Sequence, residues 1–130
     1  MIRLASDKEA KQILLEPQIV ARVGLLAEHI KVQPWIAHNK EHRLLFVFWE
    51  AGAGVYEMHI ACPKDSIRSS RVLAVEAMSW LFSMGAEKII TNCPRGKIAN
   101  MAKKLGLKLY NTDGETEFYE VTSWELKQLS

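Results

Sequence analysis

The chain has 130 residues, of which 48% are hydrophobic and 25% charged, a composition typical of a globular protein and not of a disordered one. We expect a single domain over residues 1–130, large enough to be stable without disulfides or a structural metal. Lysine and arginine total 17 against 15 acidic residues, a formal charge of +2. Because nucleic-acid-binding domains are usually far more basic, we expect no direct sequence-specific binding of nucleic acid.

The N-terminal residues predict a protein that is made in a cytoplasm and is not secreted. Charges begin within the first few residues, and no apolar stretch with a small-residue cleavage site follows. No run approaches the roughly 18 apolar residues that a membrane span requires. Cys62 and Cys93 lack the spacing of a metal site, so we expect reduced, mostly buried thiols. His38 and His42 have helical ligand spacing but lie in a polar turn, and no metal site is expected.

The first half of the chain is predicted to combine strands with two helices. Ser6 and Glu9 form a capping box, which marks the start of a helix. Pro17 suits the first turn of a second helix, whose apolar residues recur at spacings of three and four. In chain order we expect a strand over 2–5, helices over 7–15 and 17–30, and strands over 34–37, 44–50 and 55–62.

The second half is predicted to begin with the longest helix. Gly85 and Gly106 are natural C-caps of the helices that precede them, and the residues after Glu125 are expected to form a loose tail. The expected elements are a helix over 66–84, a strand over 87–93, a helix over 96–104, and strands over 107–111 and 117–122. The order predicts an α/β (α+β) fold with a mixed, mostly antiparallel twisted sheet and a central parallel strand-helix-strand crossover.

Two segments of this chain are CPKDSIRSSRVLAVEAMSWLFSMGAEKIITNCP and, after it, GKIANMAKKLGLKLY. Together with these segments, the order of elements resembles the GNAT superfamily of acyl-CoA N-acyltransferases, and the likeness covers nearly the whole chain. In that family a strand leads into a phosphate-binding turn, Gln/Arg-x-x-Gly-x-Gly/Ala, followed by a long helix, a splayed strand and a helix ending in Leu-Gly-Phe. The corresponding residues here are Arg68-Ser69-Ser70-Arg71-Val72-Leu73 and Leu105-Gly106-Leu107.

The resemblance implies acetyl-CoA or CoA as the cofactor. In this fold, backbone N–H groups at the start of the long helix hold the pyrophosphate, and glycines let the backbone approach closely. Here Arg71 and Leu73 occupy the two small-residue positions. A positive helix start still favours a phosphate, so retained binding and an ordinary helix start with solvated arginines both stay open. The candidate cofactor-binding residues are Cys62, Arg68, Ser69, Ser70, Arg71 and Val72.

The resemblance also locates the proton donor that acyl transfer requires. In many active members, a Tyr four residues before the glycine of Leu-Gly-Phe protonates the leaving thiolate, and Ala102 stands there in this chain. An Asn that accompanies cofactor binding is replaced by Gly96. Tyr110 and Tyr119 lie further along the chain and can substitute only if the fold brings one of them to the site. The two departures predict an inactive relative of the N-acetyltransferases.

The strand over 55–62 supplies the candidate catalytic base. Its two-residue period places Glu57 and His59 on one face, spaced to polarise one another. In this fold the base that deprotonates an acceptor amine usually projects from the central strands. The alternative is a hydrogen-bonded pair with a structural role.

Four further segments are Tyr56-Glu57-Met58-His59, Trp80-Leu81-Phe82, Gly85-Ala86 and Phe118-Tyr119-Glu120-Val121-Thr122. Their combination is similar to GNAT-like proteins of tailed bacteriophages, and among these to the small head-assembly proteins of short-tailed phages. This resemblance implies a head-assembly or virion-associated protein in the host cytoplasm or the virion, with phage structural proteins as partners and a homodimer as a further expectation. An active acetyl-CoA-dependent N-acyltransferase and a host-directed inhibitor are the alternatives.

Charge is unevenly distributed near the C-terminus. Five basic residues follow one another without an acid among them, and five acidic residues come next. This polarity indicates pairing within the last helix and strands, a surface that orients a partner, or a solvated face. The bases are Arg95, Lys97, Lys103, Lys104 and Lys108, and the acids are Asp113, Glu115, Glu117, Glu120 and Glu125.

Overall fold

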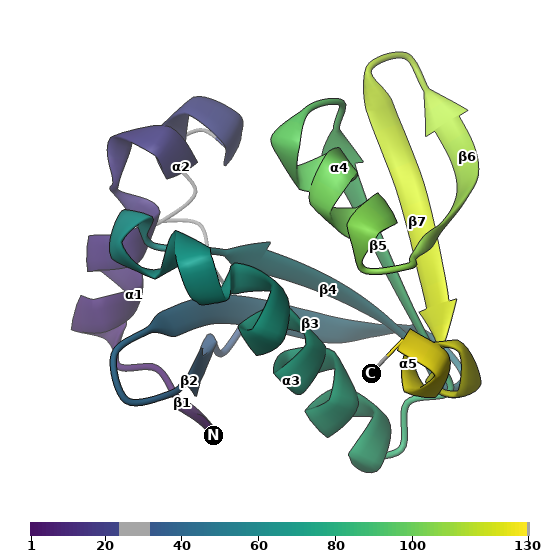
Figure 1. Ribbon diagram of the computed structural model, residues 1–130, viewed down its shortest axis with the longest axis horizontal. Helices are drawn as coiled ribbons and strands as arrows, with labels where there is room; N and C mark the ends of the chain where they lie inside the picture. Colours follow the sequence, from purple (N-terminus) through teal and green to yellow (C-terminus); the bar gives the residue numbers. More distant parts are fainter. Residues whose placement is uncertain (24–31, 130) are drawn as a thin grey trace. The chain divides into compact units, whose positions relative to one another are not determined.

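The computed structural model describes residues 1–23 and 32–129 (Figure 1). Contacts divide the chain into unit 1, Met1–Phe48 with Ile60–Ala77, and unit 2, Trp49–His59 with Met78–Ser130. The expected single domain stays a prediction. The elements are β1 (Ile2–Leu4), α1 (Asp7–Leu14), α2 (Pro17–Val23), β2 (Trp35–His38), β3 (Arg43–Gly52), β4 (Val55–Ala61), a 3-10 helix η1 (Lys64–Ser69), α3 (Ser70–Ser83), β5 (Lys88–Pro94), α4 (Lys97–Lys104), β6 (Lys108–Asp113), β7 (Thr116–Thr122) and α5 (Ser123–Leu129).

Within the described residues, the strands form a mixed sheet of seven in the order β1-β2-β3-β4-β5-β7-β6. β4 and β5 are parallel, and the register pairs 55–57 with 88–90, the first three residues of each strand. The pairs β1–β2, β2–β3, β5–β7 and β6–β7 are antiparallel. The predicted α/β fold with a parallel crossover through α3 is therefore confirmed.

Unit 1 has a core between α1 and its strands. The apolar residues of α1 recur at spacings of three and four, which places them on one side of the helix. Ile36 on β2 and Leu45 on β3 are register partners, and both are buried. The core cluster is Ala5, Ala10, Ile13, Leu14, Ile19, Ile36 and Leu45.

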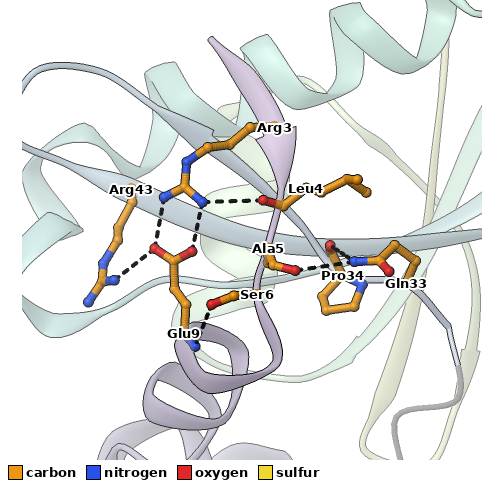
Figure 2. A network of polar contacts seen from close by, with 8 residues as sticks. All are labelled: Arg3, Leu4, Ala5, Ser6, Glu9, Gln33, Pro34 and Arg43. Atoms are coloured by element: carbon orange, nitrogen blue, oxygen red, sulfur yellow. Dashed lines mark hydrogen bonds and ion pairs between the residues drawn. The ribbon is translucent and has the colours of Figure 1, made fainter.

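α1 begins at the predicted capping residue. The Ser6 hydroxyl accepts the backbone N–H of Glu9 at 3.1 Å. The Glu9 carboxylate, which a capping box turns back toward the Ser6 N–H, instead accepts two hydrogen bonds from Arg3 at 2.7 and 2.8 Å and one from Arg43 at 2.9 Å (Figure 2). Because Arg3 lies on β1 and Arg43 on β3, this one carboxylate ties α1 to two strands.

The Glu9 cluster predicts a loss of stability in acid. The hydrogen bonds from Arg3, and to a lesser degree the one from Arg43, lower the pKa of Glu9 from 4.5 to about 2, although burial of the carboxylate acts to raise this pKa. The carboxylate therefore stabilises the fold fully above pH 4.5, and this contribution is lost as the pH falls from 4.5 towards 2. We expect Glu9→Gln to lower the free energy of unfolding by roughly 1–2 kcal/mol at pH 7 and by less at about pH 3.

Urea unfolding at both pH values measures this difference. Glu41→Gln, which changes an exposed carboxylate in the β2–β3 turn, is the matched control and should have no such effect. A loss from Glu9→Gln that is equal at both pH values would show that the arginine contacts are not its cause.

Unit 2 is built on β5, β6 and β7. β7 pairs with β5 over its whole length, and β6 pairs with the other edge of β7 with a register shift between Leu109 and Asn111. Ala99 and Ala102 are the buried residues of α4, which packs on β5. Gly85 and Gly106 adopt φ angles of 116° and 85° after α3 and α4, so both predicted C-caps are confirmed.

The predicted helix over 66–84 begins later than expected. Residues Lys64–Ser69 form the 3-10 helix η1, and α3 starts at Ser70. The cause is a tertiary contact: the buried Ser66 hydroxyl accepts the backbone N–H of Arg43 at 2.9 Å and donates to Asp65 at 2.7 Å. This contact ties η1 to the start of β3.

The loose tail predicted after Glu125 is wrong, because α5 extends to Leu129. Thr122 and Glu125 form a reciprocal cap. The Thr122 hydroxyl accepts the Glu125 backbone N–H at 3.3 Å, and the Glu125 carboxylate accepts the Thr122 backbone N–H at 3.0 Å. The predicted helix over 17–30 is described as α2, and its residues 24–30 lie outside the described residues.

Candidate functional site

Glu57 and His59 lie together on β4, as the strand alternation predicts. His59 Nε2 is 2.6 Å from Glu57 Oε2, and both side chains are partly exposed. The ring of Trp49, on β3, stacks on the His59 ring with centroids 5.3 Å apart and planes 26° apart. All three residues belong to unit 2.

This arrangement fixes the orientation of the His59 ring. When Nε2 carries the ring proton, it donates to the Glu57 carboxylate and leaves Nδ1 as the basic nitrogen. Trp49 covers one side of the ring and limits its rotation. The pair therefore has the chemistry of a general base, and the same geometry suits a structural hydrogen bond.

The predicted cofactor turn lies in unit 1, where η1 passes into α3. The Ser69 hydroxyl is 2.5 Å from His42 Nδ1, and the Ser70 backbone N–H donates to the Ile67 carbonyl. Val72 is 66% exposed, whereas Leu73 is fully buried. Arg68 and Arg71 are exposed. A row of backbone N–H groups directed at a ligand is thus interrupted at Ser70.

Cys62, the remaining candidate cofactor-binding residue, comes directly after β4. Its thiol is half-buried, and Sγ lies 3.5 Å from the Pro63 carbonyl oxygen. Cys93, at the end of β5, is buried. Neither cysteine forms a disulfide in the described part of the chain, in line with the expectation of reduced thiols.

Comparison with solved structures identifies the fold. Aminoglycoside acetyltransferase AAC(6')-Ib in complex with coenzyme A has a TM-score of 0.73 at 15% identity, covering 98% of this chain and 97% of that chain. An acetyltransferase of the GNAT family from Bacillus anthracis has 0.69 at 12%, covering 95% of each chain. A chimera of spermidine N-acetyltransferase SpeG from Vibrio cholerae and hSSAT has 0.69 at 11%, covering 98% of this chain and 99% of the chimera.

The fold is that of the GNAT acetyltransferases. No model of a known protein family matches the chain, and no curated protein matches it. At 11–15% identity the solved structures establish the fold alone. The resemblance to GNAT proteins is confirmed at that level, and the closer likeness to phage proteins stays a prediction.

The resemblance assigns a proton-donating tyrosine to position 102 and an asparagine that accompanies cofactor binding to position 96. Ala102 is buried on α4 and carries no titratable group. Gly96 is the N-cap residue of α4 and has no side chain with which to cap the helix. Tyr110 is 46% exposed on β6, on the edge of the sheet.

Tyr119 and Glu117 form a buried polar pair that the sequence analysis did not find. The Tyr119 hydroxyl donates to Glu117 Oε1 at 3.1 Å, and both residues are buried. Burial, together with the Glu117 carboxylate, raises the pKa of Tyr119 to about 12. Burial also raises the pKa of the Cys93 thiol, with a further contribution from Glu117. Tyr119 is therefore held protonated by its burial and, to a lesser degree, by the Glu117 carboxylate.

Within residues 1–23 and 32–129, no three His, Cys, Asp or Glu side chains gather in a way that can hold a metal ion. In the same part of the chain, no helix is both long enough and apolar enough to cross a membrane.

Proposed function

We propose that the protein is a phage-encoded accessory protein of head assembly or of the virion, with a GNAT fold and a degenerate acyl-CoA site. The start of α3 is the observation that supports the degenerate site. Leu73, at the second small-residue position of the turn, is a fully buried core residue, and the Ser70 N–H is taken by the Ile67 carbonyl. This arrangement is unfavourable for the pyrophosphate of CoA, because the Ser70 N–H is not free to donate to it.

The second support is the altered position on α4. Ala102 is buried and offers no proton to a leaving thiolate, and the Tyr119 hydroxyl donates its hydrogen bond to Glu117. The phage assignment rests on the four segments named above, since the structural neighbours are acetyltransferases. Phage structural proteins are the proposed partners, the host cytoplasm or the virion is the proposed location, and a homodimer is the proposed assembly.

Purified virions test the assembly role directly. In a phage that carries this gene, an antibody against the chain should detect it in purified particles or in assembling heads, and deletion of the gene should reduce the yield of filled heads. A deletion with normal heads, together with absence of the chain from particles and head intermediates, would contradict the proposal.

The Glu57–His59 pair favours a second candidate function, an N-acyltransferase acting on an amine. AAC(6')-Ib is solved with coenzyme A and kanamycin, so a structural neighbour combines this fold with an amine-bearing ligand. Here Glu57 and His59 would take a proton from the acceptor amine. In an acyl-transfer screen over amines, Glu57→Ala should abolish any activity, whereas Glu50→Ala, on the neighbouring strand, should keep it. Activity unaffected by Glu57→Ala would remove that residue from the mechanism.

A further inference from the structure

The outer side of α4 is a cationic surface. α4 has eight residues, of which Ala99 and Ala102 are buried. With 3.6 residues per turn, Lys97, Asn100 and Lys104 fall on the side opposite to these alanines, and the exposed Lys103, four residues after Ala99, lies on the flank of the helix. Together with the exposed residue that precedes the helix, they define the α4 surface: Arg95, Lys97, Asn100, Lys103 and Lys104.

The positive charge of the α4 surface is not neutralised nearby along the chain. Residues 88–112 contain no Asp or Glu. In the part of the chain that the structure describes, no ion pair involves Arg95, Lys97 or Lys103. Glu115, in the β6–β7 turn, bounds the surface on one side, where its backbone carbonyl accepts the Arg95 N–H at 2.9 Å.

Lys108 differs from Arg95, Lys97 and Lys103 in having an acidic partner. It follows α4 in the sequence and forms an ion pair with Glu125 at 2.6 Å, which raises the pKa of Lys108. Of the three interpretations of the charges near the C-terminus, pairing therefore applies to Lys108 and Glu125. Arg95, Lys97 and Lys103 are exposed, and a partner of opposite charge is their natural complement.

We propose that the α4 surface binds the phosphate backbone of nucleic acid without regard to sequence. Lys97 and Lys103 are six residues apart, which corresponds to about 9 Å along the helix axis and about 120° around it. One strand of a duplex presents a phosphate about every 3.4 Å along its axis, so a backbone that follows the flank of α4 from Lys97 to Lys103 presents two or three phosphates over this length. Lysine and arginine contacts to phosphate position a protein on the duplex and carry no sequence information.

The composition of the surface distinguishes nucleic acid from an acidic protein as the partner. Protein interfaces depend on buried aromatic or aliphatic anchors at their centre. The exposed residues of α4 are lysines and Asn100, and its large apolar side chains Ile98 and Met101 are half-buried. The surface therefore has the charge that phosphates require and lacks the apolar centre that a protein partner requires.

Fluorescence anisotropy with a labelled duplex of about 20 base pairs at about 50 mM salt tests the proposal. The test variant is Arg95→Gln/Lys97→Gln/Lys103→Gln. The control, Lys8→Gln/Lys11→Gln/Lys40→Gln, removes the same number of exposed charges from unit 1. We expect the test variant to bind at least about tenfold more weakly. The slope of log K against log salt concentration should be less steep by about 2.7, or about 0.9 for each lost contact. The control should stay within about twofold of the unaltered protein.

Three results would overturn the proposal. The first is an absence of salt-dependent binding by the unaltered protein. The second is an equal loss of affinity in both variants, which would mean that only total charge matters. Tighter binding of a poly-glutamate peptide than of the duplex would identify an acidic protein as the partner. Thermal unfolding of both variants verifies that they are folded, because all six substituted residues are exposed.

Discussion

Replacing Leu73 by alanine is expected to lower the free energy of unfolding by about 2–5 kcal/mol. The side chain is fully buried on α3, and its truncation leaves a cavity as well as losing apolar burial. Urea unfolding followed by circular dichroism measures the change. The result bears on function, because Leu73 occupies a position that is a small residue in the phosphate-binding turn of the GNAT family.

The adjacent residue provides the control. Val72 is 66% exposed, so Val72→Ala should change the free energy of unfolding by no more than about 0.5 kcal/mol. If the two substitutions had equally small effects, Leu73 would not belong to the core. The residue at this position would then give no argument against a phosphate-binding turn at the start of α3.

Replacing Tyr119 by alanine should destabilise the protein by about 3–5 kcal/mol, the range typical of large aromatic residues in a core. Tyr119 is fully buried on β7, where it pairs with Thr91 on β5 and Leu109 on β6. Tyr119→Phe keeps the ring and removes only the hydrogen bond to Glu117, so its cost should be about 1–3 kcal/mol. Thermal and urea unfolding rank the two variants.

Unfolding at alkaline pH distinguishes the contribution of the Tyr119 hydroxyl to stability from that of the ring. The pKa of Tyr119 is raised from 10.0 to about 12 in the folded state, so its contribution to stability is complete below pH 10 and is lost as the pH rises from 10 towards 12. Tyr119→Phe should be less sensitive than the unaltered protein over this range. Identical alkaline unfolding of the two proteins would show that Tyr119 is not held protonated by Glu117.

The sequence predicted those features that depend on local periodicity. The alternation of β4 placed Glu57 beside His59, and Gly85 and Gly106 marked helix ends. The long helix between two buried strands predicted the parallel crossover. These features follow from backbone geometry, which operates over a few residues.

Features that depend on contacts distant in the sequence were missed. η1 forms because Ser66 meets the Arg43 backbone, and Glu9 leaves its capping role because two arginines reach it. The stacking of Trp49 on His59 requires β3 and β4 to be adjacent. None of these contacts can be predicted from the spacing of residues that are close in the sequence.

Two features had a signal in the sequence that was not used. Thr122 and Glu125 have the Thr-x-x-Glu spacing of a capping box, which predicts a helix in place of the expected tail. Glu117 and Tyr119 are two residues apart on a strand and must share a face. Their burial depends on which face of the strand is covered, and this could not be inferred from spacing alone.

The central claim is that this GNAT fold lacks a working acyl-CoA site, and thermal unfolding with and without millimolar acetyl-CoA tests it most directly. A ligand at about 100 times its dissociation constant adds roughly 2.7 kcal/mol to the folded state. For a chain of this size that corresponds to a rise in Tm of about 10 °C. We predict no rise with acetyl-CoA beyond that seen with ATP at the same concentration. A rise of several degrees with acetyl-CoA alone would contradict the account and would make the acyltransferase the better description.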